Sequence, residues 1–191
     1  MAASDPVVPH LQDYLFRYIS REAGRLDLVV HIHTGFGIGK YFDVVDSNPL
    51  LLEPVFNDPV LRKTNFVITH GGWPFAKQSA AMLLKPNVYV DFSAIAFLLY
   101  PREVSDVLRS WLEVSPDKVL FGTDGFEIDP DMPFFNWEEL TCLGTRSARQ
   151  ALALALTEMM QNSEIPYEEA LGIARKVLRE NAVKLCKLQT P

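Results

Sequence analysis

Three short apolar segments of the chain end in a side chain that can bind a metal ion or transfer a proton, and glycine follows each. They close with His33-Thr34-Gly35, His70-Gly71-Gly72 and Thr123-Asp124-Gly125. Imidazole and carboxylate groups suit a divalent metal such as zinc, and they also serve as acids and bases. Glycine directly afterwards lets the chain turn without covering the site. The pattern predicts a metal or acid–base site built from His33, His70 and Asp124.

His31 lies two residues before His33, so on a strand both side chains point to the same face. At about 3.3 Å per residue they lie roughly 6.6 Å apart along the strand. Because His33 is nearer the strand end, we expect His33 to be the ligand. We expect His31 to line the deeper interior or to support the site through a hydrogen bond.

Each of these residues also has a purely structural interpretation. A histidine at a strand end can be a packing or capping residue, and Asp-Gly is a common turn dipeptide. Two observations favour a site. The chain has only 4 histidines, and three of them lie in two of these segments. In addition, a carboxylate that follows a buried strand is costly to bury without a partner.

The elements that must position these residues alternate along the chain. Strands of a parallel sheet buried on both faces are indicated by four short, nearly continuous apolar segments: 26–35, 65–72, 87–94 and 118–125. Helical patterns occupy 10–24, 48–64, 101–114, 146–162 and 163–188, and a long irregular segment, 126–145, follows the last strand. This order predicts right-handed βαβ units in one α/β domain over residues 1–191. In such folds, ligands bind at the carboxyl ends of the strands.

The composition limits the classes of binding partner and the cellular compartment that we expect. Hydrophobic residues make up 48% of the 191 residues, and no stretch approaches the ~20 apolar residues of a membrane span. A net charge of −6 argues against a nucleic-acid-binding surface. The first residues show no secretory signal pattern, and Cys142 and Cys186 fit no metal or redox spacing. We expect a cytoplasmic protein with a small-molecule substrate and no nucleic-acid or membrane partner.

Taken together, the segments resemble one known family. The order H-T-G (33–35), I-T-H-G-G-W-P-F (68–75), N-V-Y-V-D-F-S (87–93) and V-L-F-G-T-D (119–124), with the closing A-R-K-V-L-R-E-N-A-V-K-L-C-K-L (174–188), resembles the amidohydrolase superfamily, specifically the amidohydrolase-related (amidohydrolase-2) group. The resemblance covers about residues 10–188. In amino-acid sequence, the segments H-T-G-F-G and I-T-H-G-G-W-P-F are similar to the nodulin or glutamine-synthetase-associated members.

The resemblance implies a metal-dependent hydrolase on a TIM-type (β/α)8 barrel, with zinc as the expected ion. It assigns His33 as the metal ligand of strand five. It assigns His70, after strand six, to a second metal or to polarising substrate and water. Asp124, after strand eight, would contact the metal and act as base for the attacking water. The implied substrate is a small carbonyl, amide or carboxylate compound, although some members decarboxylate aromatic acids in the same pocket.

The chain departs from the family pattern on its amino-terminal side. The family's first strand carries an H-x-H pair that supplies two ligands, but only about 25 residues precede LVVHIHTG. A barrel needs roughly 250 residues, so we expect only strands five to eight plus the carboxyl-terminal helices. The alternative, that H-I-H is itself the strand-one pair, agrees less well with the following Thr-Gly and with the order of the segments.

Four strands cannot close such a barrel and would leave two edges open. We therefore expect a homo-oligomer or a complementing amino-terminal half, weak zinc binding and little activity of the chain alone. The competing functional hypothesis is a truncated, non-catalytic remnant or half-barrel interaction module. A third interpretation is an unrelated sheet protein that binds a phosphate-like anion at Gly71-Gly72, although no strong helix start follows.

Several further residues could contribute to a pocket. Trp73, with the two residues after it, could wall the substrate site or simply pack a tight turn. Arg146 and Arg149 could receive a substrate carboxylate or lie in solvent. Asp91, two residues before Ser93, could support the site without touching the substrate.

Overall fold

A single parallel sheet organises the protein, whose computed structural model describes residues 7–35, 43–126 and 136–189. Its strands are Val29–His33 (β1), Asn65–Thr69 (β2), Val88–Asp91 (β3) and Val119–Leu120 (β4). They pair in chain order, β1-β2-β3-β4, and each pair is parallel. Each predicted apolar segment contains one strand, so the predicted parallel α/β arrangement is confirmed.

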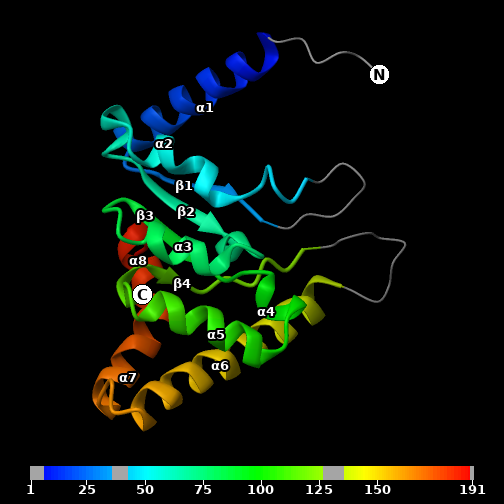
Figure 1. Cartoon of the computed structure of the whole chain (residues 1–191), viewed down its shortest axis with the longest axis vertical. Helices are drawn as coiled ribbons and strands as arrows, with labels where there is room; N and C mark the ends of the chain where they lie inside the picture. The colour runs from blue at the N-terminus through cyan, green and yellow to red at the C-terminus, as the bar shows by residue number, and fades with distance from the viewer. Residues whose placement is uncertain (1–6, 36–42, 127–135, 190–191) are drawn as a thin grey trace.

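One face of the sheet forms the main hydrophobic core. Alternate strand residues such as Phe66, Ile68 and Val90 are fully buried there. The helices α3 (Ala76–Met82), α5 (Pro101–Leu112) and α6 (Trp137–Gln161) pack against this core (Figure 1). The predicted helix 101–114 is α5, and its apolar face is buried: Val104, Val107, Leu108, Trp111 and Leu112. The Trp111 indole N–H donates to the Ala76 carbonyl at 2.7 Å, which satisfies the polar atom of a fully buried ring.

The opposite face of the sheet carries apolar residues first along the strands and polar residues at their carboxyl ends. In its first half, Val67 and Leu120 pack against Leu185 of α8 (Asn181–Cys186). His31 and His33 also lie on this face, since they alternate with the core residues of β1; His31 is level with Val67 in the register. The predicted placement of both histidines on one face is therefore correct.

Short helical turns connect the larger elements. They are the 3-10 turns Pro49–Leu52, Pro59–Leu61, His70–Gly72 and Pro116–Lys118, and the short helices α2 (Glu53–Phe56) and α4 (Ile95–Leu98). Asn48 and Asp58 cap the turns that begin at Pro49 and Pro59, accepting hydrogen bonds from backbone N–H groups with their side chains. The proline-punctuated segment 48–64 thus forms short helices, as predicted.

Helix α1 (Val7–Arg25) lies at one end of the molecule, beyond β1 (Figure 1). Within the described residues, nothing covers its apolar stripe. The stripe residues are 45 to 64% exposed: Leu11, Tyr14, Leu15, Tyr18 and Ile19. The described part of the chain contains no helix long and apolar enough to cross a membrane.

The carboxyl-terminal helices differ from the predicted ones. Helix α6 begins at Trp137 rather than at residue 146, because the Asn136 side chain accepts a hydrogen bond from the Glu139 N–H at 2.7 Å and caps it. Residues 127–135 of the predicted irregular segment lie outside the described residues. The predicted helix 163–188 is divided into α7 (Tyr167–Arg175), a π-helical turn (Lys176–Glu180) and α8, and Pro166 directly precedes α7.

The π-helical turn has a structural cause at the edge of the sheet. The Asn181 N–H donates to the Lys176 carbonyl, and the Val177 carbonyl accepts from the Phe121 N–H at 3.1 Å, just after β4. The Asn181 side-chain amide also donates to the Val119 carbonyl at 2.9 Å. The outer edge of β4 is therefore hydrogen-bonded to the chain's own carboxyl-terminal region.

Candidate active site at the carboxyl ends of the strands

His33, His70 and Asp124 meet at the carboxyl edge of the sheet. His33 is the last residue of β1, His70 directly follows β2, and Asp124 lies in the segment after β4. His70 Nε2 lies 3.3 Å from His33 Nδ1 and 3.8 Å from Asp124 Oδ2. The two rings meet edge to face, with centroids 4.7 Å apart. The structure thus brings together the three predicted residues, whose catalytic and metal-binding roles stay predictions.

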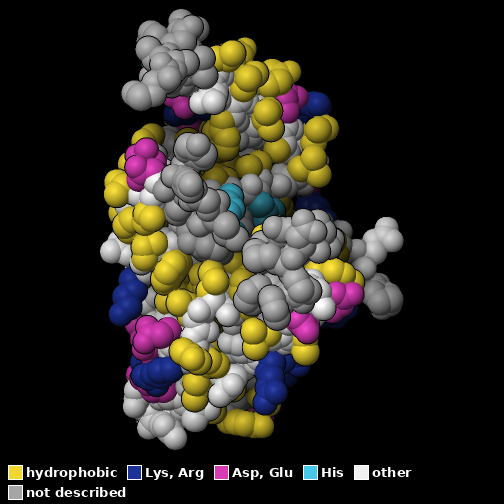
Figure 2. All heavy atoms as spheres, turned by 90° about the vertical axis from the view of Figure 1, so that its right-hand side faces the viewer, with side chains coloured by type: hydrophobic (Ala, Val, Ile, Leu, Met, Phe, Trp, Pro, Cys, Tyr) yellow, Lys and Arg dark blue, Asp and Glu magenta, His cyan; other side chains and the backbone are white. Residues whose placement is uncertain are grey.

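These three residues differ in exposure. His70 is 1% exposed, whereas His33 lies at the surface and the Asp124 side chain is 37% exposed. Figure 2 shows histidine side chains reaching the surface on the side toward which the strand arrows of Figure 1 point. A buried imidazole beneath two accessible groups can hold a fixed orientation while its partners contact a ligand.

The backbone turns sharply at His70. His70, Gly71 and Gly72 all have positive φ, at 61°, 59° and 71°. A Cβ atom added to Gly71 would overlap the six-membered ring of Trp111, so glycine is required for space as well as for conformation. Asp124 also has a positive φ, 54°. Such conformations are uncommon for residues other than glycine, and they concentrate at functional sites.

Asp91 and Ser93 hold His70 from behind. Asp91 Oδ1 accepts from the His70 N–H and the Ser93 N–H, each at 3.0 Å, and it also contacts Ser93 Oγ. His70 Nδ1 lies 3.0 Å from Ser93 Oγ and 3.2 Å from the Ser93 carbonyl oxygen. Both supporting side chains are buried. Sequence reasoning gave Asp91 an unspecified supporting role and missed Ser93; the available signal was the D-x-S spacing directly after an apolar strand.

Burial dominates the electrostatics of the site. It lowers the pKa of the His70 imidazole, against the opposing effect of the Asp91 and Asp124 carboxylates. Burial likewise raises the pKa of Asp124, against the opposing effect of His70. Both shifts favour the uncharged forms. A carboxylate with a raised proton affinity is better suited to accept a proton near neutral pH.

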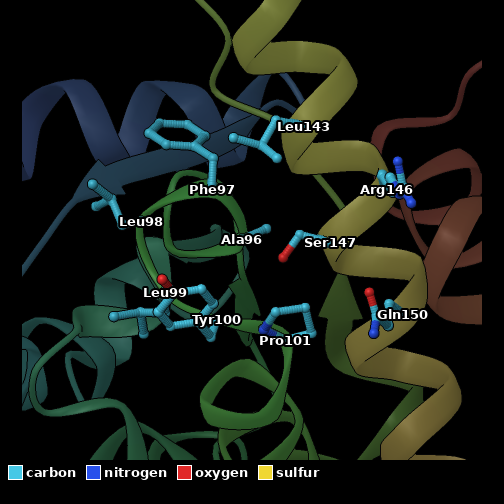
Figure 3. Close-up of a pocket in the computed structure, with 10 residues that line it drawn as sticks. All are labelled: Ala96, Phe97, Leu98, Leu99, Tyr100, Pro101, Leu143, Arg146, Ser147 and Gln150. Carbon is cyan, nitrogen blue, oxygen red and sulfur yellow. The ribbon is translucent and has the colours of Figure 1, made fainter.

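The other predicted substrate residues differ in their surroundings. His31 is exposed on the sheet face that carries His33, nearer the amino end of β1. Trp73 packs against the main core. Arg146 lines a cavity of about 380 Å³ between α4 and α6, which shares no lining residue with the histidine site (Figure 3). Trp73 nevertheless adjoins the site through its backbone N–H, which donates to the His70 carbonyl at 3.1 Å, and the substrate roles of His31, Trp73 and Arg146 stay predictions.

The two imidazoles fit a metal ion as a pair of ligands. At Zn–N distances of about 2.0–2.1 Å, two ligands of a tetrahedral ion lie about 3.3–3.4 Å apart. His33 Nδ1 and His70 Nε2 are 3.3 Å apart, while the Asp124 oxygen is farther from His70, at 3.8 Å. Within residues 7–35, 43–126 and 136–189, no three His, Cys, Asp or Glu side chains are arranged to hold a metal ion. A complete site would need further ligands.

Comparison with known proteins places the fold and the family. The FluG protein of Emericella nidulans is 28% identical over 162 residues, which are 83% of this chain and 17% of FluG. A proposed metal-dependent hydrolase from Lactobacillus casei superposes with a TM-score of 0.79 at 20% identity, covering 93% of this chain and 44% of that chain. An uncharacterized TIM-barrel protein from Bordetella bronchiseptica superposes with a TM-score of 0.52 at 21% identity, covering 90% of this chain and 49% of that one.

The chain therefore spans less than half the length of each of these three proteins. The solved structures share the α/β fold, and one of them is a TIM barrel. The model of the Amidohydro_2 family, described as amidohydrolase, matches residues 3–188. This match extends over nearly the whole sequence, so the chain belongs to the amidohydrolase family.

Proposed function

We propose that the chain provides part of the active site of a metal-dependent hydrolase that acts on a small carbonyl, amide or carboxylate compound. The observation that carries this proposal is the meeting of His33, His70 and Asp124 at the carboxyl ends of parallel strands in an amidohydrolase. The general family does not specify the substrate. A decarboxylase would use the same residues, but no observation in this structure favours decarboxylation.

In this proposal His33 Nδ1 and His70 Nε2 hold a divalent ion, which we take to be zinc because both ligands are imidazoles. Such an ion supplies Lewis-acid chemistry: it polarises a carbonyl group and lowers the pKa of water. Asp124 acts as the base that accepts a proton from the attacking water. Its partial exposure leaves it accessible to substrate, and its raised pKa suits this role.

We also propose that the chain corresponds to strands five to eight of a TIM barrel. Two observations support this: the sheet has four parallel strands, and the chain covers 44% and 49% of two longer proteins of similar fold. The exposed apolar stripe of α1 lies beside β1, whereas the outer edge of β4 is already hydrogen-bonded to Val177 and Asn181. We therefore place a complementing amino-terminal half against α1 and β1.

The incomplete ligand set supports a second candidate function for the chain by itself. Without further ligands, the same fold would act as a non-catalytic half-barrel module. The two candidates differ in whether His33 and His70 bind metal.

Zinc titration of the purified chain, followed by calorimetry, tests the proposal. We expect one weak site, below the roughly 10–16 kcal/mol of a complete structural site. His33→Ala should weaken binding by at least roughly tenfold, because it removes a ligand. His10→Ala, which replaces an exposed histidine on α1, is the matched control and should leave the zinc affinity unchanged.

Equal zinc affinity in His33→Ala and the parent chain would contradict the site. A stoichiometric, tightly held ion would contradict the incomplete ligand set. Zinc-dependent hydrolysis that persists undiminished in Asp124→Asn would contradict the role of Asp124 as the base.

A further inference from the structure

The buried contacts behind His70 determine which of its ring nitrogens carries hydrogen. Two backbone N–H groups, those of His70 and Ser93, point at Asp91 Oδ1 at 3.0 Å each. A backbone N–H can only donate, so Asp91 Oδ1 is an acceptor in both hydrogen bonds. An oxygen that receives two such donors is a poor place for a proton of its own.

The Ser93 hydroxyl group contacts both Asp91 and His70. Ser93 Oγ is in short contact with the same Asp91 Oδ1. Because that oxygen accepts, the single hydroxyl hydrogen of Ser93 points to Asp91. Ser93 Oγ then has only lone pairs left for its other neighbour. That neighbour is His70 Nδ1, at 3.0 Å.

His70 Nδ1 therefore faces two acceptors. Besides Ser93 Oγ, the Ser93 carbonyl oxygen lies 3.2 Å away, and a carbonyl oxygen also can only accept. A bare Nδ1 lone pair would be repelled by both oxygens, whereas an Nδ1–H can be shared between them. In a neutral imidazole, hydrogen on Nδ1 leaves Nε2 with its lone pair.

We infer that Asp91 and Ser93 are positioning residues that fix His70 as the Nδ1–H tautomer, so that its Nε2 lone pair points into the site. In the metal-free chain that lone pair accepts a hydrogen bond from His33 Nδ1, 3.3 Å away. The tautomer follows from the contacts of Asp91 and Ser93 alone. Its use as a metal ligand rests on the proposed function.

The test is NMR of metal-free protein with ¹⁵N-labelled histidine at a pH where His70 is neutral. Long-range ¹H–¹⁵N correlation spectra distinguish a protonated from an unprotonated ring nitrogen. We expect His70 to show a protonated Nδ1 and an unprotonated Nε2. A protonated Nε2 on His70, or an averaged mixture of both tautomers, would overturn the inference without any variant being made.

Variants of Ser93 test the cause. Ser93→Ala removes the Oγ acceptor but keeps the carbonyl, so the ratio of Nδ1–H to Nε2–H should fall by roughly two- to tenfold, the effect of one net hydrogen bond. Ser93→Thr keeps the hydroxyl group and should restore the parent spectrum. Ser105→Ala is the matched control, since Ser105 is equally buried and its hydroxyl makes no hydrogen bond within the described residues.

An unchanged tautomer ratio in a folded Ser93→Ala chain would overturn the role of Ser93. Because the spectra are recorded without metal, failure of this inference is distinguishable from failure of the proposed function. A wrong tautomer with intact zinc binding would refute only the inference. The expected tautomer without zinc binding would refute only the function.

Discussion

Replacing Gly71 with alanine should strain the turn that carries His70. Gly71 follows His70 in a left-handed conformation, with φ at 59°. An added Cβ would overlap Trp111 Cη2 and Cζ2. Trp111 has no room to retreat, because its ring is fully buried and its N–H is held by the Ala76 carbonyl. Either the ring or the turn that carries His70 must move.

Gly71→Ala has two free-energy costs, which add. Overpacking a well-filled core costs about 1–3 kcal/mol, and a left-handed backbone costs a residue with a Cβ about 1–2 kcal/mol. The free energy of unfolding should therefore fall by roughly 2–5 kcal/mol. For a chain of this length, that lowers Tm by roughly 4–20 °C. Urea unfolding and thermal unfolding measure the two quantities.

Gly172→Ala is the matched control. Gly172 lies in α7 with open space where its Cβ would be, so alanine should stabilise the protein by about 0.5–1 kcal/mol. Trp111→Phe provides a second check, since phenylalanine lacks the ring atoms that collide. The double variant should be less destabilised than the sum of the single variants by about 1 kcal/mol or more. Strict additivity, or a Gly71→Ala chain as stable as the parent, would refute the reasoning.

Two further predictions concern the surfaces at either end of the sheet. Asn181→Ala should lower the free energy of unfolding by about 1–3 kcal/mol, because the Pro116 and Val119 carbonyls lose their side-chain donor. Asn162→Ala, at an exposed helix end, is the control and should change the free energy of unfolding by no more than about 0.5 kcal/mol in the same urea titration. Equal effects of the two substitutions would contradict the contact at the edge of β4. Tyr18→Glu on α1 should leave stability within about 0.5 kcal/mol but reduce the fluorescence of a dye that binds exposed apolar surface. A large loss of stability would contradict the exposed stripe, and a dimer that this change dissociates, seen by light scattering, would identify a second copy as the partner.

The sequence was sufficient for the sheet and for the meeting of the three site residues. Buried parallel strands appear as short continuous apolar segments, and the residue after each segment lies at the carboxyl edge. His33, His70 and Asp124 could therefore be grouped without knowledge of any contact. This rule does not predict the orientation of a side chain. The His70 ring is oriented by its contacts with Asp91 and Ser93, which depend on two strands lying side by side.

The errors have a related cause. The predicted helix 163–188 has good helical periodicity throughout, but the π-helical turn in it depends on a hydrogen bond between Phe121 and Val177, 56 positions apart in sequence. In addition, α6 begins nine residues before its predicted start, because the Asn136 side chain caps it. Neither hydrogen bond leaves a periodic signal in the sequence.

The distribution of burial indicates how the site would relate to the proposed complementing half. Asp91, Ser93 and His70 are buried, so this half of the site is formed entirely within the chain. His33, by contrast, is exposed at the end of β1, the edge strand beyond which α1 lies (Figure 1). A partner that covers α1 and pairs with β1 would therefore reach His33 first. Binding of the proposed half should change the surroundings of His33 strongly and those of His70 little, because the contacts of Asp91 and Ser93 orient the His70 ring from within the chain.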